Sequence, residues 1–223
     1  MEDISKRLFW IGHASFYLKS NGYTIYIDPF KISDNVAKTE KADMILITHA
    51  HFDHFSKEDI QKVSKEETKI ITSLQTLEKS GKVEVATPGF KSAFHGIHIE
   101  AVPAYNVKSE RLNFHPKSNR WIGYIIESDG ERIYHAGDTD AIPEMKELKD
   151  IDYALLPIGG TYTMDAEEAV EAMGYIKPKH LIPMHYKNLL GQEGSRKAEQ
   201  ILRSKLDNVI TLKEVQEPTY SFQ

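Results

Sequence analysis

Four side chains that can bind a divalent metal ion occur within six consecutive residues of this sequence. They are His49, His51, Asp53 and His54, and they follow an apolar run at 44–48. Imidazole and carboxylate groups are the usual ligands of zinc and related metals. A loop at the end of a strand can turn alternate side chains to one side, so we expect His49 and His51 to share one metal ion. Asp53 and His54 then reach a second ion close by.

Two more candidate ligands lie at the ends of predicted strands. Asp138 follows the strand at 132–135, and His185 follows the strand at 181–183. Taken alone, each has an ordinary explanation, as a turn aspartate or a structural histidine. A pair of metal ions about 3.5–4 Å apart, however, needs roughly three protein ligands per ion and a bridging carboxylate. We therefore expect His185 to join the second ion and Asp138 to bridge the pair.

The composition is that of an ordinary globular protein, and it excludes several kinds of site. The chain has 223 residues, of which 40% are hydrophobic and 27% charged, and its formal net charge is −5. That charge provides no general basic surface, so we expect a small-molecule substrate and no nucleic-acid partner. The absence of cysteine excludes disulfides and cysteine-ligated clusters. We find no signal-peptide core and no apolar run of the roughly 20 residues that span a bilayer, and we expect a cytoplasmic protein. No pattern indicates an oligomeric state.

The hydrophobic pattern predicts strands at the start of each half of the chain, followed by alternating strands and helices. Strands are predicted at 8–11, 15–18, 23–28, 44–48, 98–104, 121–127, 132–135, 153–157, 181–183 and 209–212. Helical stretches are predicted at 56–65, 143–148, 165–176 and 196–206. The pairs Asn21-Gly22 and Asp129-Gly130 are typical of hairpin turns. This order indicates an α/β fold in a single domain, 1–223, with two sheets packed face to face and helices outside.

Local signals mark two helix starts and one long loop. Ser56 and Asp165 are each followed three residues later by an acidic residue, as at a helix N-cap. The longest stretch without a predicted element lies between 107 and 121, and in a compact domain such a loop is more often functional than idle. We expect its cations, listed here, to be solvated, with contact to an anionic substrate as the alternative: Arg111, Lys117 and Arg120.

Several strings of residues resemble the metal-binding motifs of the metallo-β-lactamase superfamily. They are His-Ala-His-Phe-Asp-His at 49–54, Gly-Asp-Thr at 137–139 and Pro-Met-His-Tyr at 183–186. The strings Trp-Ile-Gly-His-Ala-Ser-Phe at 10–16 and Gly-Gly-Thr-Tyr-Thr-Met at 159–164 resemble one branch in particular. That branch holds the ascorbate-6-phosphate-lactonase-like and N-acyl-phosphatidylethanolamine phospholipase D-like metal-dependent hydrolases.

The resemblance implies a four-layer αβ/βα sandwich of two mixed sheets with helices on the outer faces, and a site along one edge. The sequence departs from the family pattern at Asn106, where the family usually has a third histidine. An amide is a poor zinc ligand, so three interpretations stay open: His115 replaces it, water completes the site, or one metal binds more weakly. Asn106, Tyr162 and His13 are candidate substrate-binding residues.

These features predict a metal-dependent hydrolase that uses a metal-activated hydroxide, at a dinuclear site, to cleave a small ester-like bond such as a lactone or phosphodiester. Asp53 is the candidate catalytic residue, since it can orient the attacking water and take its proton. We expect two divalent metal ions; the ligands suit zinc, while manganese, nickel or iron can also occupy such a site. The alternatives are a ribonuclease-type phosphodiesterase, a diiron redox protein and a non-catalytic metal-binding protein.

Overall fold

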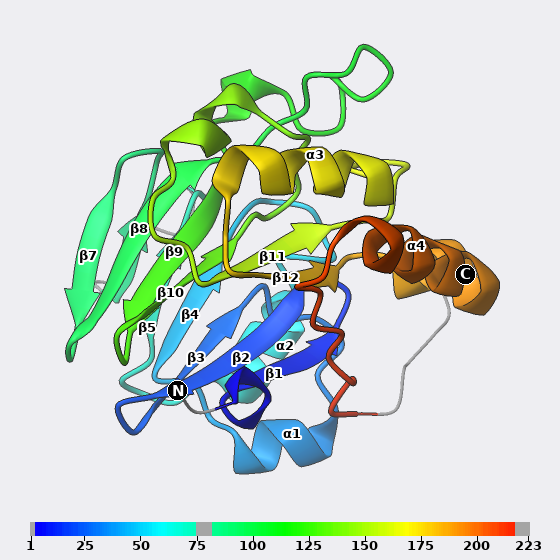
Figure 1. Cartoon of the computed structure of the whole chain (residues 1–223). Coiled ribbons are helices and arrows are strands. Elements are labelled where there is room, and N and C mark those ends of the chain that lie inside the picture. Colours follow the sequence, from blue (N-terminus) through cyan, green and yellow to red (C-terminus); the bar gives the residue numbers. More distant parts are fainter. Residues whose placement is uncertain (1–2, 75–81, 217–223) are drawn as a thin grey trace. The chain divides into compact units, whose positions relative to one another are not determined.

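The computed structural model describes residues 3–74 and 82–216 (Figure 1). The chain divides into two compact units. Unit 1 consists of Met1–Ala86 and Leu212–Gln223, and unit 2 consists of Thr87–Thr211. Each unit contains one six-stranded sheet with its own helices. Among the residues described, no helix combines the length and the apolar character that a bilayer crossing requires.

Unit 1 is built on a mixed sheet whose strands lie side by side in chain order. The strands are β1 (Leu8–Gly12), β2 (Ser15–Ser20), β3 (Tyr23–Ile27), β4 (Met44–Ile47), β5 (Lys69–Thr72) and β6 (Val83–Val85). Strands β1 to β3 pair antiparallel, and β3 to β6 pair parallel. Because β1, β3 and β4 therefore point the same way, the residues that follow them gather at one edge of this sheet. The predicted turn at Asn21-Gly22 is confirmed, since both residues adopt left-handed backbone, with φ of 52° and 82°.

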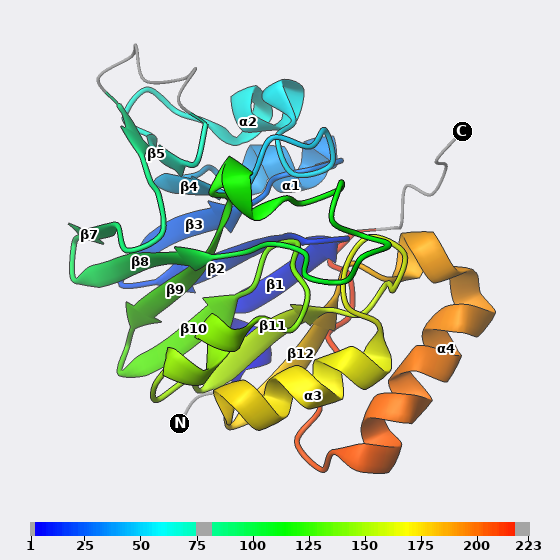
Figure 2. The same ribbon diagram turned by 90° about the horizontal axis from the view of Figure 1, so that it is seen from above.

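Two helices cover one face of the unit 1 sheet. They are α1 (Asp34–Thr39) and α2 (Lys57–Val63), preceded in the chain by the 3-10 turn η1 (Ile4–Lys6). Both helices lie on the same side of this sheet (Figure 2). Apolar side chains of both helices join one core cluster with Tyr26, Ile45 and Ile47 of the sheet. The helix predicted at 56–65 is confirmed as α2, and Asp59 N donates to the Ser56 hydroxyl at its start. Helix α1 was not predicted, because it spans only six residues and shows no helical periodicity.

Residues 212–216 return to unit 1 after the whole of unit 2 has been traversed, and appear in red in Figure 1. Glu214 pairs with Trp10 of β1, and Val215 N donates to Trp10 O over 2.9 Å. The Gln216 amide accepts from Ser33 N at 2.8 Å and donates to Lys31 O at 2.7 Å. This segment therefore holds the edge of the sheet and the start of α1.

Unit 2 contains the second mixed sheet, in the order β12-β11-β10-β9-β8-β7. Its strands are β7 (Lys91–Phe94), β8 (Ile97–Pro103), β9 (Ile122–Ser128), β10 (Glu131–His135), β11 (Tyr153–Pro157) and β12 (His180–Met184). Strands β7 to β10 pair antiparallel, and β10 to β12 pair parallel. Strands β8, β10, β11 and β12 thus point the same way, and the loops that follow all four open at one edge of this sheet.

Unit 2 carries helices α3 (Ala166–Ile176) and α4 (Lys187–Lys205), which contact each other, and the 3-10 turns η3 (Lys117–Asn119) and η4 (Pro143–Glu147). The capping box predicted at Asp165 and Glu168 is confirmed at the start of α3. The helix predicted at 196–206 begins earlier, because two helices join across a kink at Gly191, where the backbone is not helical. The strand predicted at 209–212 is wrong: Val209 forms an isolated bridge with Leu181. The sheet and helices of each unit confirm the predicted α/β class.

Candidate metal centre

The loop after β4 brings two histidine nitrogens to the spacing that a shared metal ion requires. His49 Nε2 lies 3.1 Å from His51 Nδ1. Two nitrogens bound to one tetrahedral zinc at about 2.0–2.1 Å are about 3.3 Å apart, so the observed separation matches an edge of the coordination tetrahedron. A ring nitrogen of His49 and a ring nitrogen of His54 also lie within 4.8 Å of each other. The donor set of this loop therefore fits a divalent metal.

Asp28 and Thr48, at the ends of β3 and β4, orient two of these histidines. The buried Asp28 carboxylate accepts from Thr48 N at 2.8 Å and from the Thr48 hydroxyl at 2.6 Å. Asp28 Oδ2 also lies 2.7 Å from His54 Nδ1, and the Thr48 oxygen lies 2.9 Å from His49 Nδ1. Since the Thr48 hydroxyl gives its proton to Asp28, it can only accept from His49. Both rings consequently carry the proton on Nδ1, and Nε2 is then the nitrogen whose lone pair can bind a metal.

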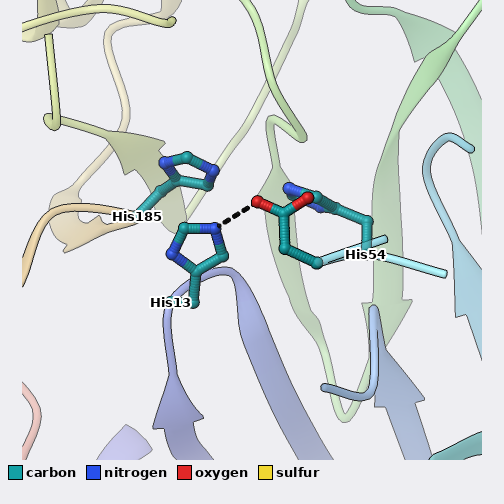
Figure 3. A group of neighbouring side chains, drawn as sticks. His13, His54 and His185 are labelled. Carbon is teal, nitrogen blue, oxygen red and sulfur yellow. Dashed lines mark hydrogen bonds and ion pairs between the residues drawn. The ribbon is translucent and has the colours of Figure 1, made fainter. Parts of the chain in front are cut away.

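His13, in the turn between β1 and β2, is the partner of Asp53 in unit 1. Its Nε2 atom lies 2.9 Å from Asp53 Oδ2, the contact drawn as a dashed line in Figure 3, which also labels His13 and His54. One ligand atom each of His13, Asp53 and His54 lie within 4.8 Å of one another. The His13 side chain is buried, and its main-chain carbonyl accepts from the Trp10 indole.

In unit 2 a single carboxylate oxygen contacts two histidines. Asp138, just after β10, places Oδ2 3.2 Å from His115 Nε2 and 3.2 Å from His185 Nε2. All three side chains are buried. His185 follows β12, whereas His115 comes from the loop between β8 and β9. This edge of the unit 2 sheet thus gathers a second set of ligand-type atoms at distances that fit a metal.

A buried polar network supports the His115 loop from behind. Asn106, just after β8, is buried; its Nδ2 donates to Asp140 Oδ1 at 3.0 Å and to the Tyr162 carbonyl at 3.1 Å. Asn106 Oδ1 accepts from His115 N at 3.0 Å and lies 2.9 Å from His115 Nδ1. Tyr162 itself exposes its ring, which packs edge-on against Phe114 with 4.8 Å between ring centroids.

Arg111 connects this network to the start of α3. Its Nε lies 3.2 Å from Asp140 Oδ1, and two further nitrogens reach the Glu168 carboxylate at 2.9 and 2.6 Å. Burial alone would raise the pKa of Glu168, but hydrogen bonds from Arg111 and Lys108 outweigh it and lower that pKa to about 2. The expectation that Arg111 is solvated is wrong, because it is buried between two carboxylates.

Three residues in or beside the candidate ligand sets have strained backbone. His13, Asp28 and His185 have φ of 53°, 45° and 56°, in the left-handed region that side chains other than glycine seldom adopt. Such strain costs about 1–3 kcal/mol per residue and is concentrated at functional sites. All three residues are buried polar groups within the candidate ligand sets or beside them.

The candidate residues from the sequence are divided between the units. Unit 1 holds His13, His49, His51, Asp53 and His54, and unit 2 holds Asn106, His115, Asp138, Tyr162 and His185. Sequence reasoning missed Asp28 and Asp140 and assigned Arg111 no structural role. The sequence gives little indication of these three residues. Each follows a strand or lies in a loop, and the residues that it contacts are distant in the sequence.

Comparison with known proteins places the chain in a family. Residues 7–185 match the β-lactamase superfamily domain, a stretch that covers most of each unit. A metal-dependent hydrolase of Natranaerobius thermophilus is 36% identical over 192 residues, which cover 81% of this chain and 83% of the relative. A candidate metal-dependent hydrolase from Parabacteroides distasonis, known from a crystal structure, is 39% identical, with a TM-score of 0.82. The match covers 94% of this chain and 93% of that protein. A metallo hydrolase from Ignicoccus hospitalis is 28% identical, with a TM-score of 0.75, and the match covers 97% of this chain and 98% of that protein.

The chain therefore belongs to the metallo-β-lactamase superfamily. This confirms both the predicted αβ/βα sandwich class and the prediction of a metal-dependent hydrolase.

Proposed function

We propose that residues 1–223 act as one hydrolase domain, with a dinuclear zinc centre that cleaves a small ester-like bond, a lactone or a phosphodiester. The ligands are His49, His51, Asp53, His54, His115, Asp138 and His185. The observation that carries this proposal is the spacing of ligand atoms inside each unit, 3.1 Å in the loop after β4 and 3.2 Å around Asp138. The family match supports a common centre for the two sets, since it extends through both units.

Zinc, when bound, polarises a substrate oxygen and makes water acidic enough to attack at neutral pH. The protein supplies the proton acceptor and the orientation of the ligands. Asp53 accepts the proton of the attacking water, and His13 Nε2 keeps its carboxylate in place. Asp28 and Thr48 hold His49 and His54 with Nε2 available. A cytoplasmic location is part of the same proposal.

The substrate that fits best has an apolar part beside its ester-like bond. Phe114 and Tyr162, both more than one-third exposed, form an aromatic pair in unit 2. Phe114 precedes His115 in the loop, so the pair stands beside a proposed ligand. Apolar surface of this kind contributes to affinity through burial of a matching group. We therefore assign Tyr162 to substrate binding together with Phe114.

The test measures metal content and hydrolysis together. The full chain is loaded with zinc and assayed on lactones with and without an aryl or acyl substituent, on bis-p-nitrophenyl phosphate, and on single-stranded RNA. His51→Ala and Asp138→Ala should each lower kcat/KM at least about 100-fold, because even the loss of a group that only orients a ligand costs 10–100-fold. Chelator should abolish turnover, and zinc should restore it.

Two exposed residues outside the ligand sets provide matched controls. His98→Ala and Asp207→Ala remove a histidine and an aspartate of the surface and should leave turnover unchanged. Full turnover by zinc-depleted His51→Ala would refute the proposal. Salt-sensitive cleavage of RNA without lactone or diester hydrolysis would favour the ribonuclease interpretation. A fully loaded protein that is inactive on every substrate would favour a binding role.

A further inference from the structure

We propose that Asn106 is a positioning residue, whose side-chain amide holds the His115 imidazole as the tautomer with its proton on Nδ1 and Nε2 directed to the metal. The proposal rests on the assignment of His115 as a ligand in the function proposed above. It assigns a role to Asn106, the residue at which this chain differs from the family pattern described above. It also differs from substrate contact, the role that the sequence suggested for Asn106.

The orientation of the Asn106 amide is fixed by the chemistry of its partners. Nδ2 faces Asp140 Oδ1 at 3.0 Å and the Tyr162 carbonyl at 3.1 Å, and both of these groups can only accept. The amide nitrogen, with its two protons, must therefore occupy this side. The amide oxygen faces His115 N at 3.0 Å, which can only donate. Both ends of the amide thus define the same orientation.

This orientation determines where the His115 proton lies. Asn106 Oδ1 is 2.9 Å from His115 Nδ1 and has no proton to give. His115 Nδ1 must consequently donate, and the neutral ring then carries its lone pair on Nε2. That nitrogen is the atom 3.2 Å from Asp138 Oδ2. A hydrogen bond to one ring nitrogen commonly fixes the other as the metal ligand.

Asn106 is itself held firmly by buried charges. Asp140 Oδ2 accepts from Val107 N at 2.8 Å and Lys108 N at 3.0 Å, so its Oδ1 faces the amide. Arg111 pairs with Asp140 and with Glu168 at the start of α3. Asn106 N also donates to His115 O over 2.8 Å, which closes the loop between the two residues. An asparagine can donate to Asp140 and accept from His115 at once, which neither aspartate nor leucine can do.

The test reads the tautomer directly in the full-length protein. Metal-free protein labelled with ¹⁵N-histidine is studied by long-range ¹H–¹⁵N correlation at about pH 8, above the ordinary histidine pKa of about 6.5. His115→Gln identifies the His115 signals. Wild-type protein should show a protonated Nδ1. Asn106→Leu should lose this preference, and Asn106→Asp, which keeps an acceptor facing the ring, should retain it.

Zinc affinity, measured by competition with a fluorescent chelator, provides the second readout. Asn106→Leu should bind zinc about 10–100-fold more weakly, as expected when a ligand loses its orienting partner. Asn106→Asp should keep most of the affinity even if the loss of the Asp140 contact lowers its melting temperature. Asn113→Leu, an exposed asparagine of the same loop, is the matched control and should resemble wild type in both measurements.

The two proposals fail in different ways. An Nδ1-protonated His115 in Asn106→Leu, or equal losses in Asn106→Leu and Asn106→Asp, would overturn the positioning role while leaving the hydrolase intact. If zinc leaves the wild-type His115 signals unchanged, His115 is not a ligand, and both the proposed ligand set and the role of Asn106 are overturned.

Discussion

At the scale of single residues, the proposed chemistry depends on buried polar groups that orient histidines. Asp28 directs His54, and the Asn106 amide, held by Asp140, directs His115. In both cases the orienting group is buried. Asp28 follows a different strand from His54, whereas Asn106 and His115 lie in the same loop after β8. The precision of the proposed ligand sets therefore comes from groups behind the histidines as much as from the histidines themselves.

The ion pair between Glu168 and Arg111 should make stability depend on pH in acid. Since the folded pKa of Glu168 is about 2, below its ordinary value of 4.5, its contribution is complete above about pH 4.5 and is lost as the pH falls toward 2. Glu168→Gln keeps the capping geometry but loses the charge, and should lower the free energy of unfolding at pH 7 by about 3 kcal/mol. Urea denaturation at pH 7, 4 and 3 measures this.

The difference in free energy of unfolding between wild type and Glu168→Gln should decrease from pH 7 to pH 4 and again from pH 4 to pH 3. Glu171→Gln, on the exposed face of the same helix, is the control and should stay within about 0.5 kcal/mol of wild type. A constant difference from pH 7 to pH 3 would contradict the assignment of the low pKa to this ion pair.

The sequence predicted these residues unevenly. The close spacing of His49, His51, Asp53 and His54 is by itself sufficient to predict a metal site. Asp28 could not be found in this way, because its role arises from the parallel pairing of β3 with β4, which brings residues 28 and 48 together. Arg111 looked like an exposed cation because a charged residue in a polar loop carries no signal of its buried partners.

At the scale of elements, the ends of parallel strands carry several of the proposed ligands, and the packing at these strand ends leaves little space. Gly159, after β11, lies so close to the end of β12 that an added Cβ would be 2.3 Å from His185 O and 2.7 Å from Leu189 Cδ1. The backbone that carries His185 can therefore keep its place only while residue 159 has no side chain.

Gly159→Ala should displace the end of β12 and with it His185, a proposed ligand. We expect a loss of about 1–3 kcal/mol of stability, as for overpacking, and weaker zinc binding. Gly174→Ala is the matched control, since it sits inside α3 and no atom of the described residues lies within 4 Å of its added Cβ. It should stabilise the protein by about 0.5–1 kcal/mol and leave zinc affinity unchanged. Wild-type zinc affinity in Gly159→Ala would show that His185 tolerates the shift or does not bind metal.

Elements with local signals were predictable, and short ones were not. Helices α2 and α3 carry N-caps and an apolar face, and both were predicted close to their observed bounds. The short strands β5, β6 and β7 have three or four residues each, too few for a periodic pattern. The start of α4 was missed because Gly191 and Gly194 are unfavourable within a helix. The helix accommodates them because it is kinked at Gly191, where the backbone is not helical.

At the scale of the whole molecule, the proposal requires ligands from both units to serve one centre. Zinc should then stabilise the wild-type protein by mass action, by about 2.7 kcal/mol at a concentration 100 times its Kd. His51→Ala in unit 1 and Asp138→Ala in unit 2 should each reduce this stabilisation. The double variant should lose little more than either single variant, because residues that act as one site are not additive. Thermal melts with and without zinc measure all four proteins.

Strictly additive losses in the double variant would instead indicate two independent metal sites. His98→Ala combined with Asp207→Ala provides the control pair and should retain the full zinc shift.

The return of residues 212–216 to β1 and α1 has a consequence for how the protein is made. Unit 2 is one continuous stretch of 125 residues and has all of its own partners as soon as it leaves the ribosome. Unit 1 emerges first but stays incomplete until residues 212–216 are made, which pair with Trp10 and hydrogen-bond to Lys31 and Ser33. At about 5–20 residues per second, translation of unit 2 imposes a delay of roughly 6–25 s. During that interval the outer edge of β1 lacks its partner, and an open strand edge is a template for aggregation. The nascent chain should thus be most vulnerable, and most in need of chaperones, between the synthesis of its first sheet and the arrival of five late residues.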